Sequence, residues 1–313
     1  MTDADYRQLS FTSHGTTCDA WFFAPEPRPG GVPAVVMAHG FGGTKDSGLV
    51  PFARALREAG LAALAFDYRG FGASEGEPRQ RVSVAGQIDD YRAAVATAAR
   101  QPGVDPGRIV LWGISMGAGH VLSIAAERSD IRAVVALVPL VSGPAAGRVA
   151  LAQNGSAALA RSAVTAARSG FAGRFGGRPT MIPLVGRPGS DAALTAPGYY
   201  EDYLALAGPT WRNEVDAAVG LELGGFRADR HADRIQAPVL MQIADFDRAA
   251  PPHAAAQAGF KARAEVRHYP CDHFGLFAGN PYFESAMRHQ IRFLRRHVVE
   301  PPVAAVGTTE GTK

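Results

Sequence analysis

One serine of this chain has neighbours suited to nucleophilic chemistry. Ser115 lies in the pentapeptide Gly-Ile-Ser-Met-Gly, between an apolar stretch that predicts a buried strand and one that predicts a helix. A turn from strand to helix this sharp crowds the positions two residues before and after the serine, which favours Gly113 and Gly117. Such a turn presents the hydroxyl at the carboxyl end of a sheet. We therefore predict that Ser115 is a nucleophile, although the bare pattern also occurs by chance in ordinary turns.

A serine hydroxyl is a poor nucleophile until a base takes its proton, and the base in turn needs an acid to orient it. When the serine occupies a strand-to-helix turn, the acid and then the histidine follow it along the chain. His273, in YPCDHFGLF, directly follows the last predicted strand, so it is the predicted base. The alternative is a histidine of an ordinary surface loop. The other eight histidines lack this position after a strand.

Two carboxylates compete for the role of the acid. Asp245 and Asp247 both follow the apolar stretch APVLMQI. We predict Asp247, because the strand should end by Asp245 and the following residues DRAAP form a loop. If Asp247 is the acid, Asp245 is a strand-end residue whose side chain bonds to backbone. Asp245 stays open as the alternative acid. Asp272 is disfavoured, because the side chains of adjacent residues diverge from one another.

The glycine-rich stretch AHGFGG (38–43) follows the first core strand. Glycines let the backbone approach a ligand closely and direct N–H groups toward it. We predict that the N–H groups of Phe41 and Met116 form an oxyanion hole. One such donor typically contributes on the order of 10²–10³ in rate.

Cofactor and metal chemistry find no support in the motifs. HGFGGTK lacks the spacing of a phosphate-binding loop, and no GxGxxG follows the first strand. No HExxH, CxxC or carboxylate cluster indicates a metal. Cys18 and Cys271 are too far apart in sequence to suggest a disulfide framework. We therefore expect no cofactor and no metal.

Strands and helices alternate along the chain, which predicts an α/β fold with a mostly parallel central sheet flanked by helices. Buried strands are predicted at 33–40, 61–70, 108–115, 131–139, 237–245 and 264–270. Apolar residues at helical spacing predict a helix that ends near Arg100, and a last helix runs over roughly 281–298 from Pro281. The opening stretch from Gln8 predicts an antiparallel hairpin at the sheet edge.

Residues 141–234 interrupt this alternation, because they separate two strands by far more than a usual loop. We predict a helical cap insertion at 141–234, a hydrolase core formed by 1–140 and 235–300, and a disordered tail at 301–313. The stretch from Val141 to Ser190 has no acidic residue and six arginines, at positions 148, 161, 168, 174, 178 and 187. They are either solvated faces of cap helices or contacts for an anionic substrate or an acyl carrier.

Several aromatic residues leave a similar choice open. They either line a substrate pocket or belong to the core, and they are Phe22, Tyr199, Tyr200, Tyr203 and Trp211. Tyr199 and Tyr203 are four residues apart and would share one face of a helix.

Composition limits the class of protein. The 313 residues carry a net charge of only +3 on 61 charged side chains, and no basic run indicates nucleic-acid binding. No apolar run approaches the roughly 18–20 residues that cross a bilayer, so we expect no membrane partner. The polar start MTDADYRQLS does not resemble a signal peptide, which predicts a cytoplasmic protein.

Taken together, the motifs resemble those of the α/β-hydrolase family over about residues 30–300. They occur in the family's order as HGFGGTKD (39–46), DYRGFGASEGEPR (67–79), GISMG (113–117), DRAAPP (247–252) and the His273 loop. AHGFGGTKD, GVDPGRIVLWG and GHVLSIAA look like the dienelactone-hydrolase-like and Xaa-Pro-peptidase-like branch, which is similar to bacterial esterases and to fungal polyketide acyltransferases.

The resemblance implies a triad of Ser115, Asp247 and His273, with Phe41 and Met116 as oxyanion donors. The serine departs from dienelactone hydrolases, which use cysteine, and from dehalogenases and epoxide hydrolases, which use aspartate. Those activities are therefore disfavoured.

The predicted function is a serine hydrolase that cleaves a carboxylic ester, lactone or thioester through an acyl-enzyme on Ser115. An acyltransferase that uses the same triad is the first alternative, and a non-catalytic ligand receptor is the second. The expected partner is a small-molecule acyl substrate. An acyl carrier, a CoA thioester and a homo-oligomer are further options that the sequence leaves open.

Overall fold

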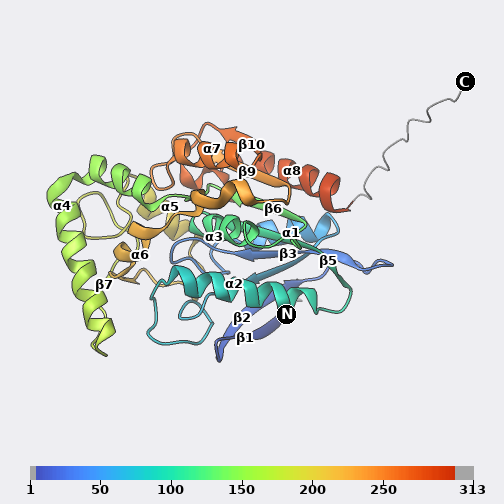
Figure 1. The fold of residues 1–313 in the computed structure, drawn as a ribbon, viewed down its shortest axis with the longest axis horizontal. Helices are drawn as coiled ribbons and strands as arrows, with labels where there is room; N and C mark the ends of the chain where they lie inside the picture. Colours follow the sequence, from blue (N-terminus) through green and yellow to red (C-terminus); the bar gives the residue numbers. More distant parts are fainter. Residues whose placement is uncertain (1–4, 300–313) are drawn as a thin grey trace, which may run out of the picture.

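The computed structural model describes residues 5–299 and is built on one eight-stranded sheet (Figure 1). The strand order is β1-β2-β4-β3-β5-β6-β9-β10. The strands are β1 (Arg7–Ser13), β2 (Thr16–Phe23), β3 (Val32–Ala38), β4 (Ala62–Phe66), β5 (Val104–Ile114), β6 (Ala133–Leu137), β9 (Val239–Ala244) and β10 (Glu265–Tyr269). β1 and β2 form the predicted antiparallel hairpin at one edge, and the strands from β4 to β10 pair in parallel. The predicted α/β class is confirmed.

Helices cover both faces of the sheet. They are α1 (Val50–Glu58), α2 (Val84–Ala99), α3 (Met116–Ala125), α7 (Pro252–Lys261) and α8 (Phe283–Leu294). α1 packs beside α8, while α2 packs beside α3. Burial between two helical layers explains why β3, β4, β6 and β9 are apolar along their whole length, since each of their residues is buried.

Two helix boundaries test the predictions from sequence. α2 ends at Ala99, as its periodicity indicates, and starts after Ser83, whose hydroxyl accepts the N–H of Gly86 at 3.2 Å. The last helix starts at Phe283 rather than at Pro281, because Tyr282 has non-helical angles (φ −105°, ψ 0°). The predicted tail lies outside the described residues.

A long segment connects β6 to β9, and we call residues 138–238 the β6–β9 segment. It contains α4 (Gly143–Arg174), α5 (Tyr199–Leu206), α6 (Val219–Gly225) and the 3-10 helix η1 (Ala228–Arg234). It also forms a small antiparallel sheet from β7 (Met181–Ile182) and β8 (Val215–Asp216), which the sequence did not predict. α4 is interrupted at Gly155 (φ 78°, ψ 167°) and runs along one end of the molecule (Figure 1).

Candidate active site

The turn after β5 has the geometry that its glycines require. Ser115 has φ 56° and ψ −119°, a conformation that typically costs a non-glycine residue of the order of 1–3 kcal/mol. A Cβ on Gly113 would lie 2.3 Å from the carbonyl oxygen of Gly117. A Cβ on Gly117 would lie 2.5 Å from the carbonyl oxygen of His39. Both positions therefore exclude side chains. At Gly113 the crowding lies within the turn, as the sequence suggested, whereas at Gly117 it comes from the backbone after β3.

Asp247 and His273 come together from the loops after β9 and β10. Asp247 Oδ2 lies 2.7 Å from His273 Nδ1, and both side chains are buried. Asp247 Oδ1 accepts the N–H groups of Ala249 at 2.8 Å and Ala250 at 2.7 Å. Burial alone would lower the pKa of His273, but the Asp247 carboxylate outweighs it and raises that pKa. Since Nδ1 is engaged by the carboxylate, Nε2 is the ring nitrogen left to exchange a proton.

Ser115 and His273 line the same cavity, which has a volume of about 1040 Å³. The structure gives the Ser115 hydroxyl no hydrogen-bond partner within residues 5–299. Hydrogen bonds between catalytic groups often tighten only when substrate binds. The arrangement therefore brings the Ser115 hydroxyl and a buried carboxylate–imidazole pair to one cavity.

The other two carboxylates have different partners. Asp245 pairs with His268 at 2.7 Å, and its side chain is 38% exposed, against 1% for Asp247. Among the residues that the structure describes, the Asp245 side chain thus pairs with a histidine, and not with backbone as its place at the strand end predicts. Asp272 accepts the backbone N–H of His273 at 2.8 Å and pairs with Arg248, so it holds the loop rather than the imidazole.

The AHGFGG loop lies directly against the serine turn. A Cβ on Gly40 would be 2.6 Å from the Cβ of Ser115 and 3.2 Å from the backbone nitrogen of Met116. In the described part of the chain, the N–H groups of Phe41 and Met116 meet no protein acceptor. Both N–H groups are thus available to donate to a ligand oxygen beside the Ser115 turn.

His39 supports this loop from within. Its Nδ1 accepts the N–H of Gly40 at 2.8 Å. Burial lowers the pKa of His39 to about 4, so the ring stays neutral at physiological pH and keeps this acceptor. Its role is to shape the loop, in contrast to that of His273.

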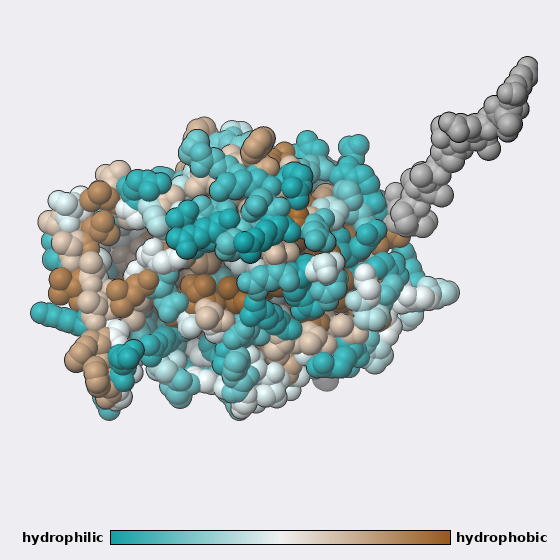
Figure 2. Space-filling model, in the orientation of Figure 1, coloured by the Kyte–Doolittle hydropathy of each residue, from teal (hydrophilic) through white to brown (hydrophobic). Residues whose placement is uncertain are grey.

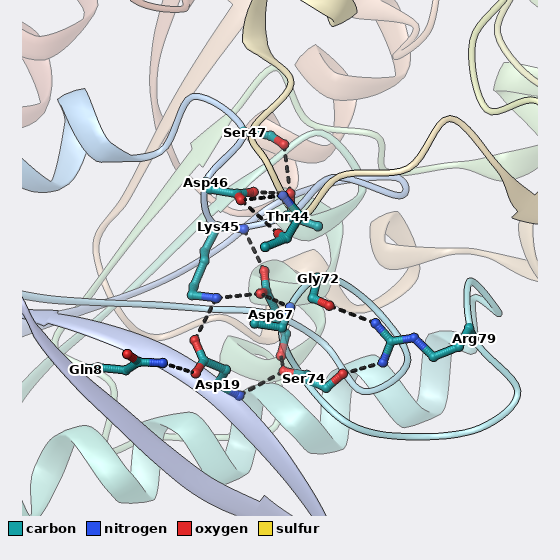
Figure 3. Close-up of polar contacts among 12 residues, drawn as sticks. Gln8, Asp19, Thr44, Lys45, Asp46, Ser47, Asp67, Gly72, Ser74 and Arg79 are labelled. Carbon is teal, nitrogen blue, oxygen red and sulfur yellow. Dashed lines mark hydrogen bonds and ion pairs between the residues drawn. The ribbon is translucent and has the colours of Figure 1, made fainter.

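Lys45, which follows the AHGFGG loop, forms a buried ion cluster with Asp67 and Asp19 (Figure 3). This cluster was not predicted from the sequence. Lys45 Nζ lies 2.6 Å from Asp67 Oδ2 and 2.7 Å from Asp19 Oδ1. The Lys45 N–H also donates to Asp67 Oδ1 at 2.6 Å. Burial would lower the pKa of Lys45, but the two carboxylates raise it. The signal was present in the adjacent motifs HGFGGTKD and DYRGFG, which place one lysine and one aspartate at the ends of neighbouring strands.

The structure resolves the choice among the five aromatic residues. Tyr199 and Tyr203 line the cavity. Phe22, Tyr200 and Trp211 do not line it, and they pack in or against the core. The six arginines from 148 to 187 are all exposed, and Arg161 alone among them lines the cavity. Four of the six lie on α4, and Arg178 and Arg187 follow it outside the helix. Most of these arginines therefore face solvent rather than the cavity.

Two findings concern other kinds of site. Within residues 5–299, no group of three or more histidine, cysteine, aspartate or glutamate side chains is arranged to hold a metal ion. None of the helices described in the structure combines the length and the apolar character needed to cross a membrane.

Comparisons with known proteins agree with this architecture. The quorum-quenching protein AidA of Acinetobacter baumannii is 36% identical over 293 residues, which cover 93% of this chain and 94% of AidA. The thiohydrolase aneE of Aspergillus aculeatus is 28% identical over 84% of this chain and 85% of its own length. The crystal structure of the α/β hydrolase GrgF from Penicillium sp. superposes with a TM-score of 0.79 at 23% identity, covering 95% of this chain and 100% of GrgF.

Residues 32–271 match the family model described as serine aminopeptidase, S33. That range spans most of the sheet, the serine turn and the Asp247 loop. The chain therefore belongs to the S33 serine aminopeptidase family of α/β hydrolases, and it is a serine hydrolase.

Proposed function

We propose that this enzyme hydrolyses carboxylic esters, lactones or thioesters through an acyl-enzyme on Ser115. The observation that carries the proposal is the buried pair of Asp247 and His273, whose imidazole shares a cavity with Ser115. Phe41 and Met116 complete the proposed site as backbone donors.

In the proposed reaction, Ser115 Oγ attacks the carbonyl carbon while His273 Nε2 takes its proton. The N–H groups of Phe41 and Met116 stabilise the oxyanion of the tetrahedral intermediate. The intermediate collapses, the bond to the leaving oxygen or sulfur breaks, and His273 gives its proton to that leaving group. Water then attacks the acyl-enzyme as His273 takes a proton from it, and collapse of the second intermediate returns that proton to Ser115 Oγ and releases the acid. Every proton is handled by residues of the chain, so the scheme needs no cofactor.

The lining of the cavity supports a substrate with a substantial apolar acyl part. α4 contributes alanine and leucine side chains to its wall, among them Ala146, Ala150 and Leu159. We propose that the β6–β9 segment acts as the cap of the site. The name of the thiohydrolase aneE supports cleavage of a thioester as one of the proposed activities. We place the enzyme in the cytoplasm, where its two free cysteines would stay reduced.

Acyl transfer to an alcohol or amine is the second candidate, and the outer face of α4 favours it. Val164, Phe171 and Phe175 are 51%, 68% and 70% exposed, and the helix carries four arginines and no acidic residue. An apolar stripe flanked by arginines suits an acidic, amphipathic carrier that delivers an acyl group. Figure 2 shows apolar residues along α4, beside a hollow that separates this helix from the body of the molecule.

A substrate panel separates these activities. We expect release of acid from p-nitrophenyl esters, alkyl lactones and acyl thioesters, and no cleavage of aminoacyl p-nitroanilides. Addition of a competing alcohol should leave most of the product as free acid if the enzyme is a hydrolase. Product that is mostly the new ester would favour the transferase, and cleavage of the anilides alone would contradict the proposal.

A further inference from the structure

Helix α5 carries two buried tyrosines that face the cavity. Tyr199 and Tyr203 lie one turn apart, so their rings share one face of the helix. Their hydroxyl groups nevertheless contact two different parts of the site. The Tyr203 hydroxyl bonds to the loop of residues 39–46 after β3, which we call the oxyanion loop because it contains Phe41, a proposed oxyanion donor. The Tyr199 hydroxyl bonds to the loops that hold Asp247 and His273.

Tyr203 acts on the oxyanion loop. Its hydroxyl donates to the carbonyl oxygen of Phe41 at 3.0 Å. Its ring stacks on Trp211 with centroids 5.0 Å apart and meets Phe274 edge-on at 5.8 Å, so the ring itself is held in place. Fixing the carbonyl of Phe41 restricts the backbone of the residue whose N–H is proposed to bind the oxyanion.

Tyr199 acts on the other half of the site. Its hydroxyl donates to Asp272 Oδ1 at 2.8 Å. Asp272 Oδ1 also accepts the backbone N–H of Arg248 at 3.1 Å and the backbone N–H of His273 at 2.8 Å. Arg248 directly follows Asp247, so this contact joins the acid loop to the base loop.

Residues of the β6–β9 segment outside α5 also contact the oxyanion loop. Thr210 donates to Asp46 Oδ2 through its N–H at 2.9 Å and through its hydroxyl at 2.8 Å. A Cβ on Gly42 would lie 1.7 Å from Leu184 Cδ1, so the β6–β9 segment packs directly on the loop. The loop geometry thus depends on this segment as well as on β3.

We infer that α5 fixes the Phe41 loop relative to the loops that carry Asp247 and His273, with Tyr199 and Tyr203 as positioning residues. The inference rests on the proposed function, because it assigns Phe41 to the oxyanion hole. It implies that the segment that covers the cavity also sets the geometry of catalysis. Loss of the Tyr199 or Tyr203 hydroxyl should therefore change kcat more than KM.

The test compares Tyr203→Phe with Tyr200→Phe. Each change removes one hydroxyl from α5, but Tyr200 does not line the cavity, and its ring lies under the guanidinium of Arg187. We expect Tyr203→Phe to lower kcat about 10-fold and to leave KM within about twofold. This decrease in kcat is smaller than that expected for loss of an oxyanion donor, because the Phe41 N–H is still present. A boronic acid that mimics the tetrahedral intermediate should bind Tyr203→Phe about 10-fold more weakly. Tyr200→Phe should match the wild type in both measurements, and both variants should keep the wild-type far-ultraviolet circular dichroism.

A second variant tests the other half of the clamp. Tyr199→Phe loosens the loops that carry Asp247 and His273, so the carboxylate should raise the pKa of His273 less. We expect the acid limb of the kcat/KM profile to move to lower pH, together with a reduced kcat.

Two results would overturn the inference. One is an active enzyme in which Tyr203→Phe and Tyr200→Phe have the same kcat and inhibitor affinity. The other is a Tyr199→Phe variant with the wild-type kcat and pH profile. Failure of the proposed function would give a different result: the wild-type protein itself would show no turnover that depends on Ser115.

Discussion

At the scale of single residues, Asp247 and Asp245 are nearly adjacent in sequence, but their carboxylates have different partners. Asp247 uses one oxygen for two backbone N–H groups and the other for His273. Its orientation is therefore fixed before any substrate arrives. Asp245 instead pairs with a half-exposed histidine on the surface, where solvent screens the interaction.

This difference predicts unequal effects of two matched substitutions. Asp247→Asn should lower kcat by about 10⁴-fold, because an amide favours the wrong tautomer of the imidazole. Asp245→Asn should change kcat less than about twofold, as for a surface pair. Steady-state kinetics on one ester would check both, and a larger loss in Asp245→Asn would contradict the assignment of the acid.

The same pair predicts a pH dependence. His273 must be neutral to accept a proton, and Asp247 raises its pKa above the usual 6.5. The wild-type kcat/KM should therefore rise with pH through an apparent pKa above 6.5. Asp247→Asn removes the main group that raises the pKa of His273, and burial, the largest influence, lowers that pKa against the smaller opposing effect of Asp272. The acid limb of the residual activity should therefore move to lower pH.

At the scale of elements, the oxyanion loop is held by a buried cation as well as by its glycines. The Lys45 side chain spans from this loop to Asp67 after β4 and to Asp19 on β2, as Figure 3 shows. Two carboxylates offset the cost of burying one ammonium group. The loop is thereby tied to two neighbouring strands.

Removal of the cation should destabilise the fold. Lys45→Met leaves Asp67 buried without its partner, which should lower the free energy of unfolding by about 3–5 kcal/mol. The double variant Lys45→Met/Asp67→Asn should lose less, because the uncompensated charge is gone. Urea denaturation followed by circular dichroism would measure both.

An exposed ion pair supplies the control for this experiment. Arg128→Ala breaks the surface pair with Asp130 and should cost less than about 1 kcal/mol. A loss in Lys45→Met no larger than the loss in Arg128→Ala would show that the buried cluster does not hold the loop.

At the scale of the whole molecule, the strand order brings the distant motifs together. β3 and β5 are neighbours, which places the AHGFGG loop beside Ser115, and β9 and β10 are neighbours, which pairs Asp247 with His273. All four loops leave the carboxyl ends of parallel strands, where α/β proteins bind ligands.

Much of this arrangement could be predicted from the sequence, because it depends on local signals. Apolar runs gave the strands, and the glycines around Ser115 gave the turn. The choice between Asp245 and Asp247 was harder to predict, since they differ only in contacts made after folding. Tyr203 could not be assigned a role, because its partner Phe41 lies 162 residues away. The β6–β9 segment was readable only as helical, since alanine-rich periodicity does not specify which face packs on the cavity.

The central claim is that Ser115 carries the acyl group, and intact-protein mass spectrometry with a fluorophosphonate probe tests it most directly. The wild type should gain one probe mass, located on Ser115 by peptide mapping. Ser115→Ala should keep the wild-type circular dichroism and Tm, gain no mass, and lose turnover by up to about 10⁶-fold, by analogy with serine proteases. Labelling at another residue, or a Ser115→Ala variant that turns over substrate at the wild-type rate, would contradict the account.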